Sequence, residues 1–182
     1  MARVFDIVEA PDQGAREMVT RVPAQGSGDF RIGSQVICRE SQAAVFFRDG
    51  QALDVMGPGR HVLSTANLPI LTSLLSVPYG GTSPFQAAVY FVNQKVFTNM
   101  KWGTRQPVVF RDRELGAVRL RAHGVFAMRV ADPVLFLNTL SGTQGVTTTE
   151  DLESYLRDVG QGRLNDLLGE RLPTLQAPEP HF

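Results

Sequence analysis

Apolar and polar residues alternate along much of the chain between residues 34 and 130, and this pattern predicts β-strands. The expected strands are residues 17–22, 35–39, 42–48, 52–56, 60–63, 86–92, 95–102 and 106–110. The longest alternating stretch is 117–130, where apolar side chains occupy the even positions and arginines and His123 occupy odd positions. We expect one long strand there, with one face packed on a core and the other exposed to solvent or in contact with a partner.

The hydrophobic period changes after residue 131 and becomes that of helices. Asp132 followed by Pro133 predicts an N-cap and a first helical residue for a short helix over 134–140. The spacing of Thr147 and Glu150 predicts the start of a second helix, which Leu172–Pro173 should end or bend. Strands that precede helices predict an α+β fold, a twisted and mostly antiparallel sheet with packed C-terminal helices.

Glycine and proline mark the expected turns. Asp49–Gly50 predicts a two-residue hairpin, Gly57–Gly59 a sharp corner, and residues 24–29 a loop. Residues 69–75 fit either a strand or a helical turn. The first eight residues are either a short amphipathic piece or a docked or frayed terminus, and the second interpretation is favoured because so short a helix is marginal in water.

Composition narrows the class of protein. The 182 residues suffice for one domain, and 18 basic residues balance 18 acidic ones, so no net charge favours nucleic acid. The lone Cys38 cannot form an internal disulfide and is expected to be a buried strand residue. No apolar run reaches the ~18 residues of a membrane span, which predicts a cytoplasmic protein, peripheral at the inner face of the cell membrane if it meets a membrane at all.

Catalytic motifs are absent from the sequence. The three histidines are far from one another and from Cys38, and neither a P-loop nor a dinucleotide-binding glycine motif occurs. We therefore predict no catalytic, cofactor-binding or metal-binding residues, and a protein that is not an enzyme. The alternative is a hydrolase whose site carries no motif, which a buried carboxylate pair in a deep pocket would favour.

An arginine-rich stripe is the one electrostatic feature of the sequence. Arg111, Arg119, Arg121 and Arg129 are the candidates for contact with an acidic partner, a phosphate-bearing lipid or a neighbouring subunit. The favoured alternative is a solvated sheet face, balanced by nearby carboxylates. Aromatic residues are not interleaved on that face, so RNA binding is not predicted.

An ordered set of motifs resembles the SPFH (band 7, prohibitin-homology) domain, in particular its bacterial YdjI-like branch. The matching motifs are Val36–Val45, Gly57–His61, Leu68–Leu71, Ser83–Phe85, Tyr90–Asn93, Lys101–Thr104 and Val118–Gly124. The resemblance implies domain limits of 31–172. It leaves 1–30 as an N-terminal segment with the first strand, and 173–182 as a tail or the start of a truncated region.

The resemblance also implies a function. It indicates a non-enzymatic scaffold or adaptor that self-associates and recruits partners, such as a phage-shock-type (ESCRT-III-like) membrane-remodelling protein. The alternative is a lipid or small-ligand binding domain that uses the arginine-rich strand or the N-terminal apolar segment. Longer members of the branch carry a zinc ribbon, but residues 1–182 contain no cysteine pair, so zinc is not implied.

Overall fold

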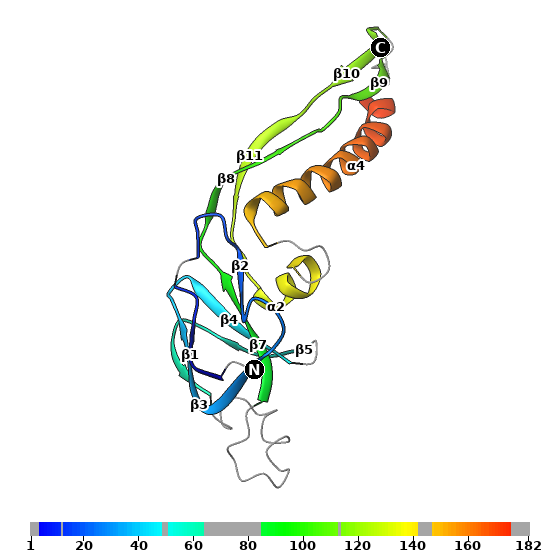
Figure 1. Cartoon of the computed structure of the whole chain (residues 1–182). Coiled ribbons are helices and arrows are strands. Elements are labelled where there is room, and N and C mark those ends of the chain that lie inside the picture. Colours follow the sequence, from blue (N-terminus) through cyan, green and yellow to red (C-terminus); the bar gives the residue numbers. More distant parts are fainter. Residues whose placement is uncertain are drawn as a thin grey trace. The chain divides into compact units, whose positions relative to one another are not determined.

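The computed structural model describes residues 4–11, 13–48, 51–63, 85–112, 114–141 and 147–175. The chain divides into two compact units (Figure 1). One unit consists of Met1–Val96 and Arg129–Thr149, and the other of Phe97–Met128 and Glu150–Phe182. The chain therefore passes from one unit to the other three times. The domain limits at residues 31 and 172 stay a prediction.

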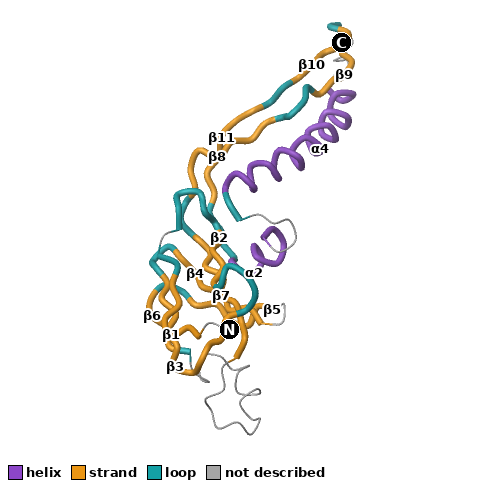
Figure 2. Tube along the Cα trace, in the orientation of Figure 1, coloured by secondary structure: helices purple, strands orange, loops and turns teal. Residues whose placement is uncertain are grey.

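The first unit is built on a seven-stranded sheet (Figure 2). Its strands are β1 (Val4–Glu9), β2 (Val19–Val22), β3 (Gly28–Cys38), β4 (Gln42–Arg48), β5 (Gln51–Met56), β6 (Gly59–Val62) and β7 (Phe85–Asn93). The order is β1-β3-β7-β4-β5, with β2 added on β7 and β6 on β3. Only β1 and β3 are parallel among these described pairs, which confirms the mostly antiparallel sheet.

Strand β3 changes partner along its length. Gly28–Phe30 pair with β7, whereas Gln35–Cys38 pair with β6. Gly33 lies between these segments with a φ of 93°, a left-handed conformation that favours glycine. The expected loop over 24–29 therefore ends early, because Gly28 and Asp29 already belong to the strand.

Strand β7 is the central strand of this sheet. It pairs with β2, β3 and β4, and Val89, Phe91 and Val92 are fully buried. On one side of the sheet the rings of Phe30 and Phe46 meet edge to face with centroids 5.3 Å apart. The core cluster consists of Val8, Ala10, Phe30, Val36, Cys38, Ala44, Phe46, Met56, Leu63, Ala87, Val89 and Phe91.

A short helix follows the strands of this unit. Helix α2 (Pro133–Phe136) continues into one turn of π-helix, η1 (Leu137–Ser141), and lies near β4 and β5. The Asp132 carboxylate accepts a hydrogen bond from the Leu135 N–H at 2.9 Å, which confirms the predicted cap. Phe136 and Leu137 are buried, so the cap fixes where an apolar turn begins.

The second unit combines four strands with a long helix. The strands are β8 (Phe97–Gly103), β9 (Val108–Asp112), β10 (Gly116–Leu120) and β11 (His123–Met128), and the helix is α4 (Thr149–Leu175). Antiparallel pairs form between β8 and β11 and between β9 and β10. We call these four strands the ribbon.

The prediction of one strand over 117–130 is wrong in one respect, because the strand is interrupted at Arg121 and Ala122. The Thr104 N–H donates to the Ala122 carbonyl at 2.9 Å, and the Ala122 N–H donates to Thr104 Oγ1 at 3.2 Å. These bonds replace ladder pairing at the interruption. The alternation survives it, since even positions from 118 to 128 are half-buried and odd positions are exposed.

Two further predictions meet the structure at the chain's ends. The N-terminal segment is strand β1, not an amphipathic helix, and Val8 is 1% exposed, in line with the favoured docked terminus. Helix α4 continues through Pro173 to Leu175 rather than ending at Leu172. The Asp49–Gly50 hairpin and residues 69–75 lie outside the described residues, although Arg48 and Gln51 pair across that turn.

Candidate functional site

Three of the four predicted arginines belong to the second unit and one to the first. Arg119 lies on β10 and Arg121 in the link to β11, and both side chains are exposed on the second unit. Arg129 is exposed but belongs to the first unit. Arg111 lies on β9 opposite Ala117, and its side chain is outside the described residues. Of the four, Arg119 and Arg121 are the two in the second unit whose exposed side chains the structure describes.

These two arginines belong to a larger exposed surface, which we call the basic ribbon face. It consists of Lys101, Val109, Arg119, Arg121 and Val125. Val109 pairs with Arg119, and Val125 pairs with Lys101, so the valines lie beside the cations. Val109 is 63% exposed and Val125 is 65% exposed. Such a mixture of exposed apolar and cationic side chains suits an acidic partner surface.

Neither Arg119 nor Arg121 forms a hydrogen bond or ion pair with another side chain in the part of the chain that the structure describes. Their guanidinium groups can therefore donate to carboxylate or phosphate oxygens from outside this chain.

Although the whole chain has no net charge, the ribbon of the second unit is basic and its helix segment is acidic. The ribbon segment, residues 97–128, carries six basic and two acidic residues, a formal charge of +4. Residues 150–182 carry three basic and seven acidic residues, a formal charge of −4. The positive half is visible in the sequence as the arginine-rich stripe, whereas the helix acids resemble ordinary first-turn residues.

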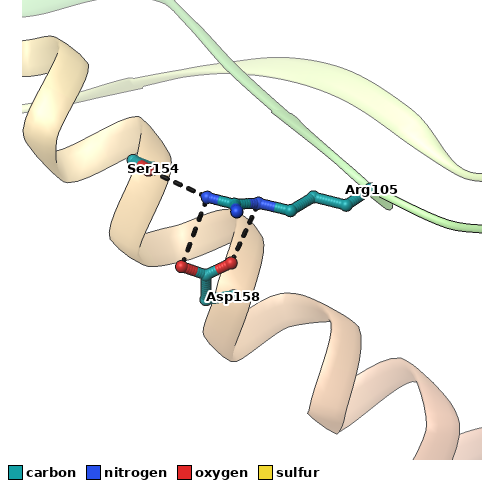
Figure 3. Close-up of polar contacts among 3 residues, drawn as sticks. All are labelled: Arg105, Ser154 and Asp158. Carbon is teal, nitrogen blue, oxygen red and sulfur yellow. Dashed lines mark hydrogen bonds and ion pairs between the residues drawn. The ribbon is translucent and has the colours of Figure 1, made fainter.

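The helix and the ribbon are joined by polar contacts near the start of α4. Arg105 donates to Ser154 Oγ at 3.0 Å and forms an ion pair with Asp158 at 2.9 Å (Figure 3). The Lys101 backbone N–H donates to a Glu153 carboxylate oxygen at 2.8 Å. The sequence offered no signal for these contacts, because the partners are about 50 residues apart in the chain.

Arg129 lines a small open pocket in the first unit. The pocket has a volume of about 450 Å³ and is lined by Glu40, Ser41, Gln94, Arg129, Val130 and Ala131. It pairs one carboxylate with one guanidinium and lacks a histidine or cysteine. The pocket can hold polar groups, but it presents no nucleophile with an adjacent base.

A buried polar network lies elsewhere in the first unit, and no local sequence pattern predicts it. Gln42 is 3% exposed, and its amide donates to the Ala10 carbonyl at 2.9 Å and to Gln13 Oε1 at 2.8 Å. Gln13 in turn donates to the Phe91 carbonyl at 2.8 Å and to Thr20 Oγ1 at 3.0 Å. The network ties β4 to β2, β7 and the segment before β2, so its role is structural.

Cys38 is buried at 4% exposure, as predicted. Desolvation raises the pKa of its thiol to about 11, although a hydrogen bond from the Ala44 backbone partly opposes this. A thiol that stays protonated at neutral pH is a poor nucleophile and metal ligand. Within the described residues, no three or more histidine, cysteine, aspartate or glutamate side chains are placed to hold a metal ion.

Comparison with known proteins gives two matches. The profile of the SPFH domain-Band 7 family matches residues 19–177. The protein named "Uncharacterized protein YdjI" from Bacillus subtilis (strain 168) is 30% identical over 130 residues, which is 70% of this chain. The matched region is 40% of that relative, so the chain spans well under two thirds of its length.

No solved structure matches the chain. Among the described helices, none combines the length and the apolar character that crossing a bilayer requires.

Proposed function

Because the chain belongs to the SPFH domain-Band 7 family, we propose that it is a non-enzymatic scaffold or adaptor that self-associates and recruits partners at a membrane surface. The family match confirms the resemblance found in the sequence motifs. Members of this family are in general membrane-associated scaffold proteins without enzymatic activity. The match over residues 19–177 is the observation that carries the proposal.

The surface of the second unit supports this role. The basic ribbon face is exposed and unoccupied by other described side chains, and it offers hydrogen-bond donors together with apolar area. A scaffold needs such a surface outside its core, whereas an enzyme needs a convergent set of polar groups in a cleft.

The partner that we propose is a phage-shock-type, ESCRT-III-like membrane-remodelling protein, and the place is the cytoplasmic face of the cell membrane. The second candidate is direct binding of anionic lipid, which the exposed pair Arg119 and Arg121 favours. The N-terminal segment does not support the lipid alternative, since β1 is paired in the sheet and Val8 is buried.

Sedimentation velocity of the purified chain over a range of concentrations tests self-association, and we expect species larger than the monomer. Co-flotation with vesicles of phosphatidylglycerol and phosphatidylethanolamine, compared with phosphatidylcholine alone, tests lipid binding. A chain that stays monomeric in solution and on vesicles would overturn the scaffold proposal. Flotation of an otherwise monomeric chain with anionic vesicles alone would favour the lipid-binding alternative.

A further inference from the structure

Helix α4 turns different faces toward the ribbon and away from it. Polar contacts to the ribbon come from Glu153, Ser154 and Asp158. At 3.6 residues per turn, Val159 lies roughly 100 to 140° around the helix from each of them. Leu152, seven residues earlier on the same side of the helix, is buried, whereas Val159 is 43% exposed, so from Val159 onward this side presents an apolar side chain to solvent.

An acidic side chain lies on that same face. Asp166 follows Val159 by seven residues, which places it on nearly the same side of the helix, about 10 Å further along. Asp166 is exposed. Between them, Gly160 and Gly162 are exposed and have open space where a side chain would stand, so another surface can approach the helix closely.

The basic ribbon face repeats this arrangement with the opposite charge. Arg121, in the interruption before β11, and Val125 are both exposed odd positions of the alternation, four residues or at most about 13 Å apart. The ribbon thus presents Val125 with the Arg121 guanidinium at a distance similar to that between Val159 and the Asp166 carboxylate on the helix. The two surfaces are complementary, because each pairs an exposed valine with a side chain of opposite charge.

We infer that the outer face of α4 in one copy binds the basic ribbon face of a second copy, with Val159 against Val125 and Asp166 against Arg121. The inference rests on the proposed self-association and names its surface. Contact between two ribbon faces would bring Arg119 and Arg121 of both copies together, and like charges oppose it. Contact between different surfaces repeats from copy to copy, so the assembly is a ring or a filament rather than a two-fold dimer.

Cysteine cross-linking tests this contact, because buried Cys38 is the chain's one native thiol and should give little background. Copies carrying Val125→Cys are mixed with copies carrying Val159→Cys and oxidised. We expect a cross-linked dimer in the mixture and little in either variant alone. Val62→Cys, exposed by 45% on the first unit, is the matched control.

Charge reversal gives an independent test by sedimentation velocity. Arg121→Glu and Asp166→Arg should each raise the apparent Kd of self-association by about tenfold or more. The double variant should recover much of the loss, because every contact again joins opposite charges. Reversal of exposed Arg39 on the first unit is the control and should change little.

The outcomes separate the two proposals. A wild-type chain that associates without the mixed cross-link and without response to these reversals overturns this contact and leaves the scaffold role standing. Strong cross-linking of Val125→Cys alone would show that two ribbon faces meet. A wild-type chain that never associates overturns both.

Discussion

Gln42 is a polar side chain in a strand whose neighbours are buried and apolar. Its amide satisfies the Ala10 carbonyl and Gln13, and its Oε1 accepts the Arg39 N–H at 3.0 Å. Without Gln42, each of these groups would lack a hydrogen-bond partner in or near the core. Leaving a buried polar group unpaired destabilises a protein by more than a typical hydrogen bond stabilises it. One residue therefore holds together segments that the sequence separates by 32 positions.

Replacing Gln42 by leucine should lower the free energy of unfolding by about 2 to 3 kcal/mol, because several buried polar groups lose their hydrogen-bond partner. Denaturant unfolding followed by far-ultraviolet circular dichroism measures the change. Gln86→Leu, on the exposed position of β7, is the matched control and should fall within about 0.5 kcal/mol of wild type. Equal losses in the two variants would contradict the structural role of the network.

Cys38 gives a prediction for pH. Its thiol has a reference pKa of 9.0, and burial raises the pKa in the folded protein to about 11. The unfolded chain therefore loses this proton first, so the thiol's contribution is complete below pH 9 and is lost as pH rises toward 11. The loss amounts to about 2 to 3 kcal/mol over that interval.

Denaturant titrations between pH 8 and pH 11 in wild type and in Cys38→Ala measure this effect. Every other residue is the same in both proteins, so the difference between their pH profiles isolates the thiol. Parallel pH profiles of the two proteins would show that the thiol is not desolvated.

Among the elements, the ribbon depends on one close contact between β8 and β11. Trp102 and Gly124 are cross-strand partners, and a Cβ at position 124 would lie 2.5 Å from Trp102 Nε1. The indole therefore occupies the space that any other residue at 124 would need. Gly160 in α4 is the opposite case, because nothing lies within 4 Å of the position that its Cβ would take.

The same substitution should thus have opposite effects at these two glycines. Gly124→Ala should destabilise the second unit by about 1 to 3 kcal/mol, since the Trp102 ring must move. Gly160→Ala should stabilise α4 by up to about 1 kcal/mol. Trp102 is the only tryptophan, so its fluorescence during unfolding reports on this unit. Equal tolerance of alanine at both positions would contradict the close Trp102 contact.

The elements that local sequence determines were predictable, and those that depend on distant partners were not. Strand β4 has the predicted bounds, and Asp132 caps α2 as expected, because alternation and capping involve near neighbours. The interruption at Ala122 depends on Thr104, and β1 depends on parallel pairing with β3. The alternation of apolar and polar residues near Ala122 or in β1 does not reveal either distant partner.

In the whole molecule, the candidate site was predictable in part. The odd positions of the alternating stretch correctly placed Arg119 and Arg121 on an exposed face. Arg129 continues the same alternation but belongs to the other unit, which periodicity alone does not reveal. The acidic helix was not recognised as a counterpart, because its distance from the ribbon is not encoded in spacing along the chain.

The three passages of the chain between the two units have a consequence for its synthesis. The sheet of the first unit contains strands from the first 96 residues, yet residues 129–149 complete that unit, and Met18 and Val19 donate backbone hydrogen bonds to the Thr147 carbonyl. A ribosome makes the whole ribbon before it makes those last residues. The early strands therefore stay incompletely covered while residues 97–128 emerge, and the first unit is completed only after residue 149 has been translated.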